Sequence, residues 1–89
     1  MPTVIIPEAY RGPTQGLSEI TVEATSVVEA LDAVEADHKG FRALVFDQHG
    51  SVLKFVRLFV NEVQIDNAKL DLALDEGDRL EVLAAIAGG

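Results

Sequence analysis

One well-delimited helical segment between strand-like stretches is the feature that most constrains how this chain can fold. Ser26 followed by Glu29 matches the capping-box pattern that opens many helices. Apolar residues then recur at helical spacing, and Gly40 is placed to end the segment. The apolar side of the predicted helix carries Val27, Val28, Leu31 and Val34.

Two strand-like stretches precede this helix. Residues 3–7 place Val4 and Ile6 on one face, and residues 17–23 alternate around Ile20 and Val22. Between them, residues 10–16 are rich in Gly and Pro, which is typical of a turn. The pattern predicts a hairpin.

The stretches after the helix complete a sheet. Residues 41–46 are expected to extend the core, and residues 47–51 to form a loop. A strong strand is predicted at 55–61, a short return strand at 63–65, an acidic turn at 75–78 and a last strand at 79–87. Their expected inward-facing residues are Val56, Leu58, Val60, Leu80, Val82 and Ile86.

The order of these elements favours an α+β fold in which one main helix packs on one face of a mixed sheet of four to five strands. With 89 residues and 48% apolar residues, the chain suits one small domain. We expect this domain to span residues 1–84, followed by a flexible tail over residues 85–89.

Charge and composition exclude several function classes. The net charge of −8 opposes binding to nucleic acid and favours a basic or mixed-charge protein partner. The sequence has no cysteine, no recognisable signal peptide and no apolar run long enough for a membrane span. We therefore expect a cytoplasmic protein that binds neither nucleic acid nor membrane.

The tail is the strongest functional signal in the sequence. Ala87, Gly88 and Gly89 offer almost no side chain to a core, and glycine backbone is costly to order. Such a segment can enter a narrow channel and present the unhindered carboxylate of Gly89. A partner enzyme could adenylate that carboxylate and pass it to a nucleophile.

Three stretches resemble the prokaryotic ubiquitin-like sulfur carriers (MoaD/ThiS-like proteins), which have the β-grasp fold. Residues 55–62 look like the central strand and turn of that family, residues 74–82 like its acidic turn and last strand, and residues 87–89 like its terminus. The long segment 41–54 and the start of the chain look most like the cysteine-biosynthesis (CysO-like) branch.

The resemblance implies a carrier, not an enzyme. In this family a ubiquitin-activating-like enzyme uses ATP to adenylate the terminal glycine, and a sulfur donor converts it to a thiocarboxylate. Gly89 would then carry sulfur to an acceptor such as a cysteine synthase-like enzyme. No bound cofactor is implied.

Other functions remain open. The chain could be the small subunit of molybdopterin synthase, a ubiquitin-like modifier joined to targets through Gly89, or a plain β-grasp binding module. We expect no catalytic residue and no metal site. Asp47, His49 and Ser51 share one loop instead of converging from separate elements as a catalytic triad does.

A surface patch is the candidate site for partners. If the central and last strands are neighbours, their outward-facing residues combine apolar side chains with cations, which suits a protein interface. An alternative is that residues 41–54 fold over the phenylalanines. The predicted patch comprises Phe55, Arg57, Phe59, Arg79 and Leu83.

Overall fold

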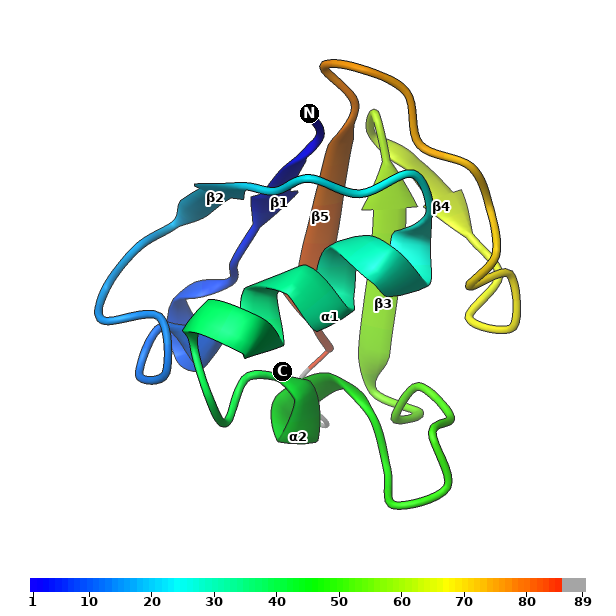
Figure 1. Ribbon diagram of the computed structural model, residues 1–89. Coiled ribbons are helices and arrows are strands. Elements are labelled where there is room, and N and C mark those ends of the chain that lie inside the picture. Colours follow the sequence, from blue (N-terminus) through cyan, green and yellow to red (C-terminus); the bar gives the residue numbers. More distant parts are fainter. Residues whose placement is uncertain (86–89) are drawn as a thin grey trace.

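The computed structural model describes residues 1–85 as a five-stranded mixed sheet with helices on one face. Figure 1 shows α1 lying across the sheet and α2 beneath it. The elements in chain order are β1 (Thr3–Ile5), η1 (Glu8–Tyr10), β2 (Glu19–Thr21), α1 (Val27–Asp37), α2 (Arg42–Val45), β3 (Val56–Val60), β4 (Val63–Ile65) and β5 (Arg79–Ala84).

The strands lie side by side in the order β2-β1-β5-β3-β4. β1 and β5 run parallel, while the pairs β1–β2, β3–β5 and β3–β4 are antiparallel. This topology confirms the predicted β-grasp arrangement and the neighbouring central and last strands. The N-terminal strands are shorter than predicted, and β5 ends at Ala84. The predicted inward position of Ile86 lies outside the described residues.

The start of α1 confirms the predicted cap with one difference. The Ser26 hydroxyl accepts from the backbone N–H of Glu29 at 3.3 Å. The Glu29 carboxylate accepts from the backbone N–H and the hydroxyl of Thr25, at 2.9 and 2.7 Å, instead of from the N–H of Ser26. The bond from the Thr25 hydroxyl, followed by that from its backbone N–H, lowers the pKa of Glu29.

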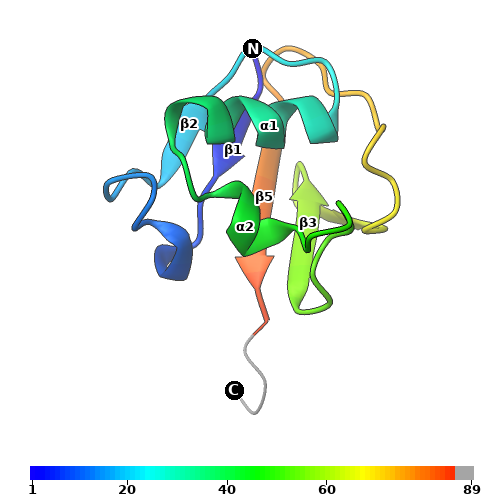
Figure 2. The ribbon, with the colours of Figure 1, turned by 60° about the horizontal axis from the view of Figure 1, so that its bottom comes forward.

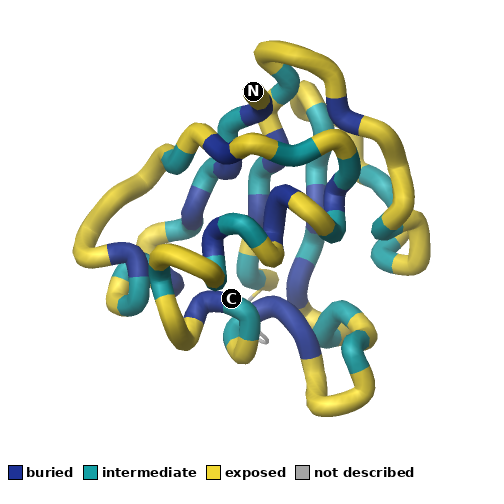
Figure 3. Tube along the Cα trace, in the orientation of Figure 1, coloured by how far each residue is buried: buried dark blue, intermediate teal, exposed yellow. Residues whose placement is uncertain are grey.

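The core fills the space between the helices and the sheet. Figure 3 shows buried segments where these layers face one another and exposed loops around them. On α1, Ala30 joins the buried stripe, whereas Val28 is only partly buried. The largest fully buried hydrophobic side chains are Phe41, Ile6, Leu31, Leu58, Leu80, Val4, Val27, Val34, Val45, Val56 and Val82.

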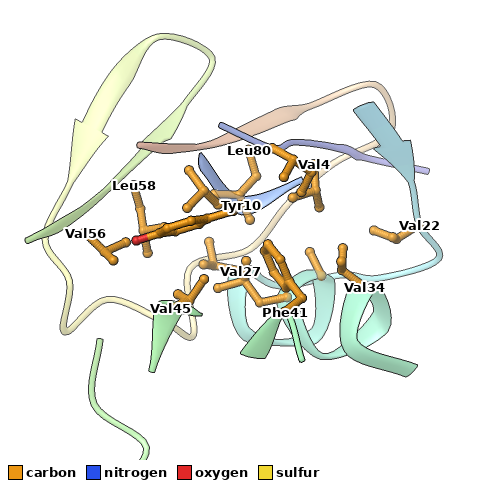
Figure 4. Close-up of a cluster of buried hydrophobic side chains, with 14 of the residues drawn as sticks. Val4, Tyr10, Val22, Val27, Val34, Phe41, Val45, Val56, Leu58 and Leu80 are labelled. Atoms are coloured by element: carbon orange, nitrogen blue, oxygen red, sulfur yellow. The ribbon is translucent and has the colours of Figure 1, made fainter. Parts of the chain in front are cut away.

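Tyr10 is a core residue that the turn prediction missed. It closes the short helix η1 and is only 6% exposed, while residues 11–16 form the expected turns. Figure 4 shows its ring inside the apolar cluster with the hydroxyl directed toward Val56. That hydroxyl has no hydrogen-bond partner among the described residues, and burial raises the pKa of Tyr10.

Residues 41–54 pack on the helix side of the sheet. Phe41, Val45 and Phe46 belong to the core, which confirms the expected extension, although the short helix α2 was not predicted. The Glu35 carboxylate ties this segment to α1 by accepting from the backbone N–H of Arg42 at 2.7 Å and of Gly40 at 3.2 Å. These bonds, the one from Arg42 first, lower the pKa of Glu35.

Candidate functional site

The face of the sheet opposite the helices is the candidate site. Both helices lie on the other face, as Figure 2 shows after a rotation. Side chains alternate between the two faces along a strand, so the residues next to the buried ones point outward. On β3 and β5 these outward-facing residues are Arg57, Phe59, Arg79, Glu81 and Leu83.

The predicted patch residues do lie on this outer face or at its border. Arg57 is the cross-strand neighbour of Leu83, and the carbonyl of Phe55 accepts from the N–H of Ala85 at 2.7 Å. Phe55 is 49% exposed and Leu83 is 38% exposed, while Arg57 and Phe59 are partly buried. The alternative, in which residues 41–54 cover the phenylalanines, is therefore wrong for Phe55.

The two arginines of the patch have different surroundings. The Arg57 guanidinium turns back along the chain and donates to the carbonyls of Lys54 and Val56. The Arg79 guanidinium lies 3.4 Å from the Glu19 carboxylate on β2. The patch thus has an apolar and cationic end near Phe55 and a charged end near Arg79.

The sequence interpretation left Glu81 out of the patch. Glu81 lies between Phe59 on β3 and Ile5 on β1, at the centre of the outer face. The signal was available in the alternation of β5, which places Glu81 on the same face as Arg79 and Leu83. The predicted patch was limited to apolar residues and cations, so it did not include Glu81 although the strand alternation predicts its place on this face.

The tail continues directly from the sheet. β5 ends at Ala84, and Ala85 is still bonded to Phe55 at the edge of the patch. The predicted tail and adenylation residues Ala87, Gly88 and Gly89 lie outside the described residues. The structure therefore places only the base of the tail, beside the apolar end of the outer face.

A group of side-chain hydrogen bonds joins the two segments that resemble the family's central strand and its acidic turn. The Asn61 side chain donates to Asp78 Oδ1 at 3.0 Å and accepts from the N–H of Arg79 at 3.0 Å. Asp78 Oδ2 accepts from the N–H of Asp75 at 2.7 Å. The bond from Asn61, followed by that from Asp75, lowers the pKa of Asp78. These contacts fix the turn that leads into β5.

The 47–51 loop is built as a turn. Asp47 Oδ1 accepts from the backbone N–H groups of His49 and Ser51, at 2.8 and 3.0 Å. These bonds, the one from Ser51 first, lower the pKa of Asp47. The Asp47 carboxylate therefore organises the loop backbone instead of orienting the His49 ring.

Within residues 1–85, no group of three or more His, Asp or Glu side chains is arranged to hold a metal ion. None of the helices in this part of the chain is both long enough and apolar enough to span a membrane.

Comparison with known proteins identifies related carriers. The sequence pattern of the ThiS family matches residues 10–89 of the chain. A chain in the crystal structure of the Amycolatopsis orientalis BexX/CysO complex is 30% identical, with full coverage of both chains and a TM-score of 0.90. Mycobacterium tuberculosis CysO, described as an antigen, is 25% identical over 97% of this chain and 100% of its own, with a TM-score of 0.87.

A more distant structure supports the fold alone. SAMP1 from Haloferax volcanii is 20% identical, covers 99% of this chain and 98% of its own, and has a TM-score of 0.78. No curated protein sequence gives a significant match. The family and the CysO structures therefore carry the functional argument.

Proposed function

Since the chain belongs to the ThiS family, whose members are sulfur carriers and not enzymes, we propose that it carries sulfur on the carboxyl group of Gly89. The observation that carries this proposal is the extent of the family match, which runs to residue 89 and so includes Gly88 and Gly89. The chain acts as a cosubstrate, and the catalysis lies in its partner enzymes.

The chemistry proceeds in two steps on the partner enzyme. The Gly89 carboxylate attacks the α-phosphate of ATP, which forms an acyl adenylate and releases pyrophosphate. Hydrosulfide from the sulfur donor then attacks the acyl carbon and displaces AMP, leaving a thiocarboxylate. Adenylation is needed because a free carboxylate is a poor electrophile, and the thiocarboxylate then donates its sulfur to an acceptor enzyme.

Glycine at the last two positions suits this reaction. Without a Cβ atom, Gly88 and Gly89 let the backbone lie in a narrow tunnel and leave the acyl carbon open to attack. β5 leads into this tail at the edge of the outer sheet face. A partner that docks on that face can therefore receive the tail in its active site.

We further propose that the outer face is where partners dock. Phe55, Phe59 and Leu83 supply apolar contact area beside the base of the tail, and Arg57 and Arg79 supply charge. The related Amycolatopsis protein is solved in a complex with BexX, which supports docking to a partner enzyme here.

The two CysO structures favour the cysteine-biosynthesis branch among the possible acceptors. A cysteine synthase-like enzyme, or another enzyme that builds a sulfur-containing metabolite, is then the proposed sulfur acceptor. Because the activating step consumes ATP, the proposal places the protein in the cytoplasm.

An intact mass spectrum of the protein isolated from its own host tests the proposal. The expected result is an oxygen-for-sulfur mass gain at Gly89, followed by a further increase equal to the added alkyl group after alkylation of thio acids. Gly89→Ala should fold normally and accept little AMP from ATP and the activating enzyme. A matched control, Ala85→Ser, changes an exposed residue before the diglycine and should be adenylated normally.

The same preparations separate the alternative functions. Higher-mass conjugates that vanish when Gly89 is deleted would favour a protein modifier. A tightly copurifying large subunit would favour molybdopterin synthase. Normal adenylation of Gly89→Ala, or a terminus that never reacts with ATP and the activating enzyme, would refute the carrier proposal.

A further inference from the structure

Glu81 occupies the centre of the outer sheet face among apolar neighbours. Its cross-strand neighbours are Ile5 on β1 and Phe59 on β3, and Leu83 follows it on the same face of β5. Glu81 is partly buried although no helix covers this face. A carboxylate in such a position loses further hydration when any protein docks over it.

No cation within the described residues pairs with Glu81. The ion pairs of residues 1–85 join the Met1 amino group to Glu76, Arg42 to Asp32, and Arg79 to Glu19. Arg79 shares the outer face with Glu81, but its guanidinium lies 3.4 Å from Glu19 instead. The structure thus leaves the Glu81 carboxylate without an ionic partner of its own.

A hollow of about 290 Å³ opens beside this carboxylate. Its lining combines an apolar wall from Ile5 with polar and charged groups, and Glu19 lies beyond Arg79. The carboxylates of Glu62 and Glu81 and the guanidinium of Arg79 line the space, so its formal charge is −1. The lining residues are Ile5, Asn61, Glu62, Arg79 and Glu81.

We propose that the activating enzyme inserts an arginine side chain into this hollow and pairs its guanidinium with Glu81. The inference rests on the proposed docking of that enzyme on the outer face. A carboxylate buried at the centre of an interface without a partner costs several kcal/mol, and a cation from the docked enzyme removes this cost while Arg79 keeps its pair with Glu19. The negative charge around the hollow is complementary to that cation.

Arginine suits the hollow better than lysine. A guanidinium can form two parallel hydrogen bonds with a carboxylate, and it is less strongly hydrated than an ammonium group. The methylene stem of arginine can pack on Ile5, which forms the apolar wall of the hollow. Glu81 would thereby fix the register in which the enzyme receives the tail.

Binding of purified activating enzyme from the same host to Glu81 variants tests this inference. Glu81→Gln should weaken binding by about 30-fold or more, mainly through faster dissociation, because the enzyme's arginine loses its buried partner. Glu81→Asp, which keeps the charge on a shorter side chain, should lie between the wild type and Glu81→Gln. The melting temperatures of both variants should match that of the wild type.

Three controls make the result specific. Asp37→Asn removes the same charge from the exposed end of α1 and should leave binding unchanged. Glu62→Gln removes a charge at the rim of the hollow, so it should alter mainly the association rate and its salt dependence. Phe59→Ala tests the docking face itself.

The outcomes separate this inference from the function on which it rests. If Phe59→Ala weakens binding while Glu81→Gln binds as well as or better than the wild type, the arginine contact is wrong and the docking face stands. If neither variant changes binding, the docking face is wrong as well. Adenylation of Gly89 in either case would leave the carrier function intact.

Discussion

The two faces of one sheet have different tasks in this protein. On β3 and β5, Leu58 and Leu80 face the helices and are fully buried. Their chain neighbours Phe59 and Glu81 face away from the helices and meet each other across the strands. In each strand, therefore, one residue lies in the packed core and the next residue lies on an accessible surface.

The carboxylates divide in the same way. On the helix side, Glu29, Glu35 and Asp47 accept hydrogen bonds from backbone N–H groups that begin a helix or shape a loop. On the outer face, Glu62 and Glu81 take part in none of the ion pairs of the described residues. The comparison teaches that the three helix-side carboxylates hold the fold, while Glu62 and Glu81 are available to a partner.

Leu58→Ala, on the core side, is expected to have the largest effect on stability. It removes a fully buried side chain and should lower the free energy of unfolding by about 2–5 kcal/mol, because it loses burial and leaves a cavity. Chemical denaturation measures this change. At a temperature where the variant is folded, its affinity for the activating enzyme should equal that of the wild type.

Phe59→Ala is the matched change on the outer face. Phe59 is only partly buried, so the loss of stability should be smaller than that of Leu58→Ala. Binding to the activating enzyme should weaken by about 30-fold, as expected for a central aromatic residue of an interface. If the variant is largely unfolded and its folded fraction binds normally, Phe59 stabilises the fold and does not contribute to partner binding.

The sequence predicted the core side well because its signals are periodic. Alternation along β3 and β5 identified the buried residues, and the Ser26 cap marked the start of α1. These patterns depend on neighbours in the chain, which the sequence contains directly. The α+β class followed from them, whereas the strand neighbours of the candidate patch came from the resemblance to the β-grasp fold.

Features that depend on distant contacts were not predictable. Tyr10 stands just before a Gly- and Pro-rich turn, and nothing local indicates that its ring reaches the core. The short helix α2 has too few residues to show a period, and the Glu35 carboxylate that begins it lies on another helix. The contact of Glu81 with Ile5 comes from the parallel pairing of β1 with β5, which the local sequence pattern does not indicate.

Glu35→Gln and Glu81→Gln compare equal charge removals on the two sides. Glu35→Gln weakens two bonds that hold residues 40–42, so it should lower the free energy of unfolding by about 1 kcal/mol. This is below the usual range for bonds to charged acceptors because Glu35 is partly exposed. Glu81→Gln should leave stability unchanged. If chemical denaturation shows equal decreases in the free energy of unfolding for the two variants, the distinction between the two sets of carboxylates is wrong.

Lowering the pH should have the smallest effect of these changes. It should reduce the free energy of unfolding slightly for each hydrogen-bonded carboxylate. Hydrogen bonds lower the pKa values of Glu29, Glu35, Asp47 and Asp78 below the ordinary 4.5 for Glu and 3.8 for Asp. The unfolded chain therefore binds protons at a higher pH than the folded one. Each group contributes its full stabilisation above its ordinary pKa and loses it as the pH falls through its lowered folded value.

The free energy of unfolding should consequently decrease as the pH is lowered from about 5 to about 3. Glu35→Gln removes one of the groups responsible, so its curve should fall less steeply than that of the wild type. The two curves should approach each other at the acid end, where the wild-type Glu35 is protonated and its bonds to the N–H groups of Gly40 and Arg42 are weakened. Parallel curves would mean that these bonds do not depend on the charge of Glu35, and the structural role assigned to that charge would be wrong.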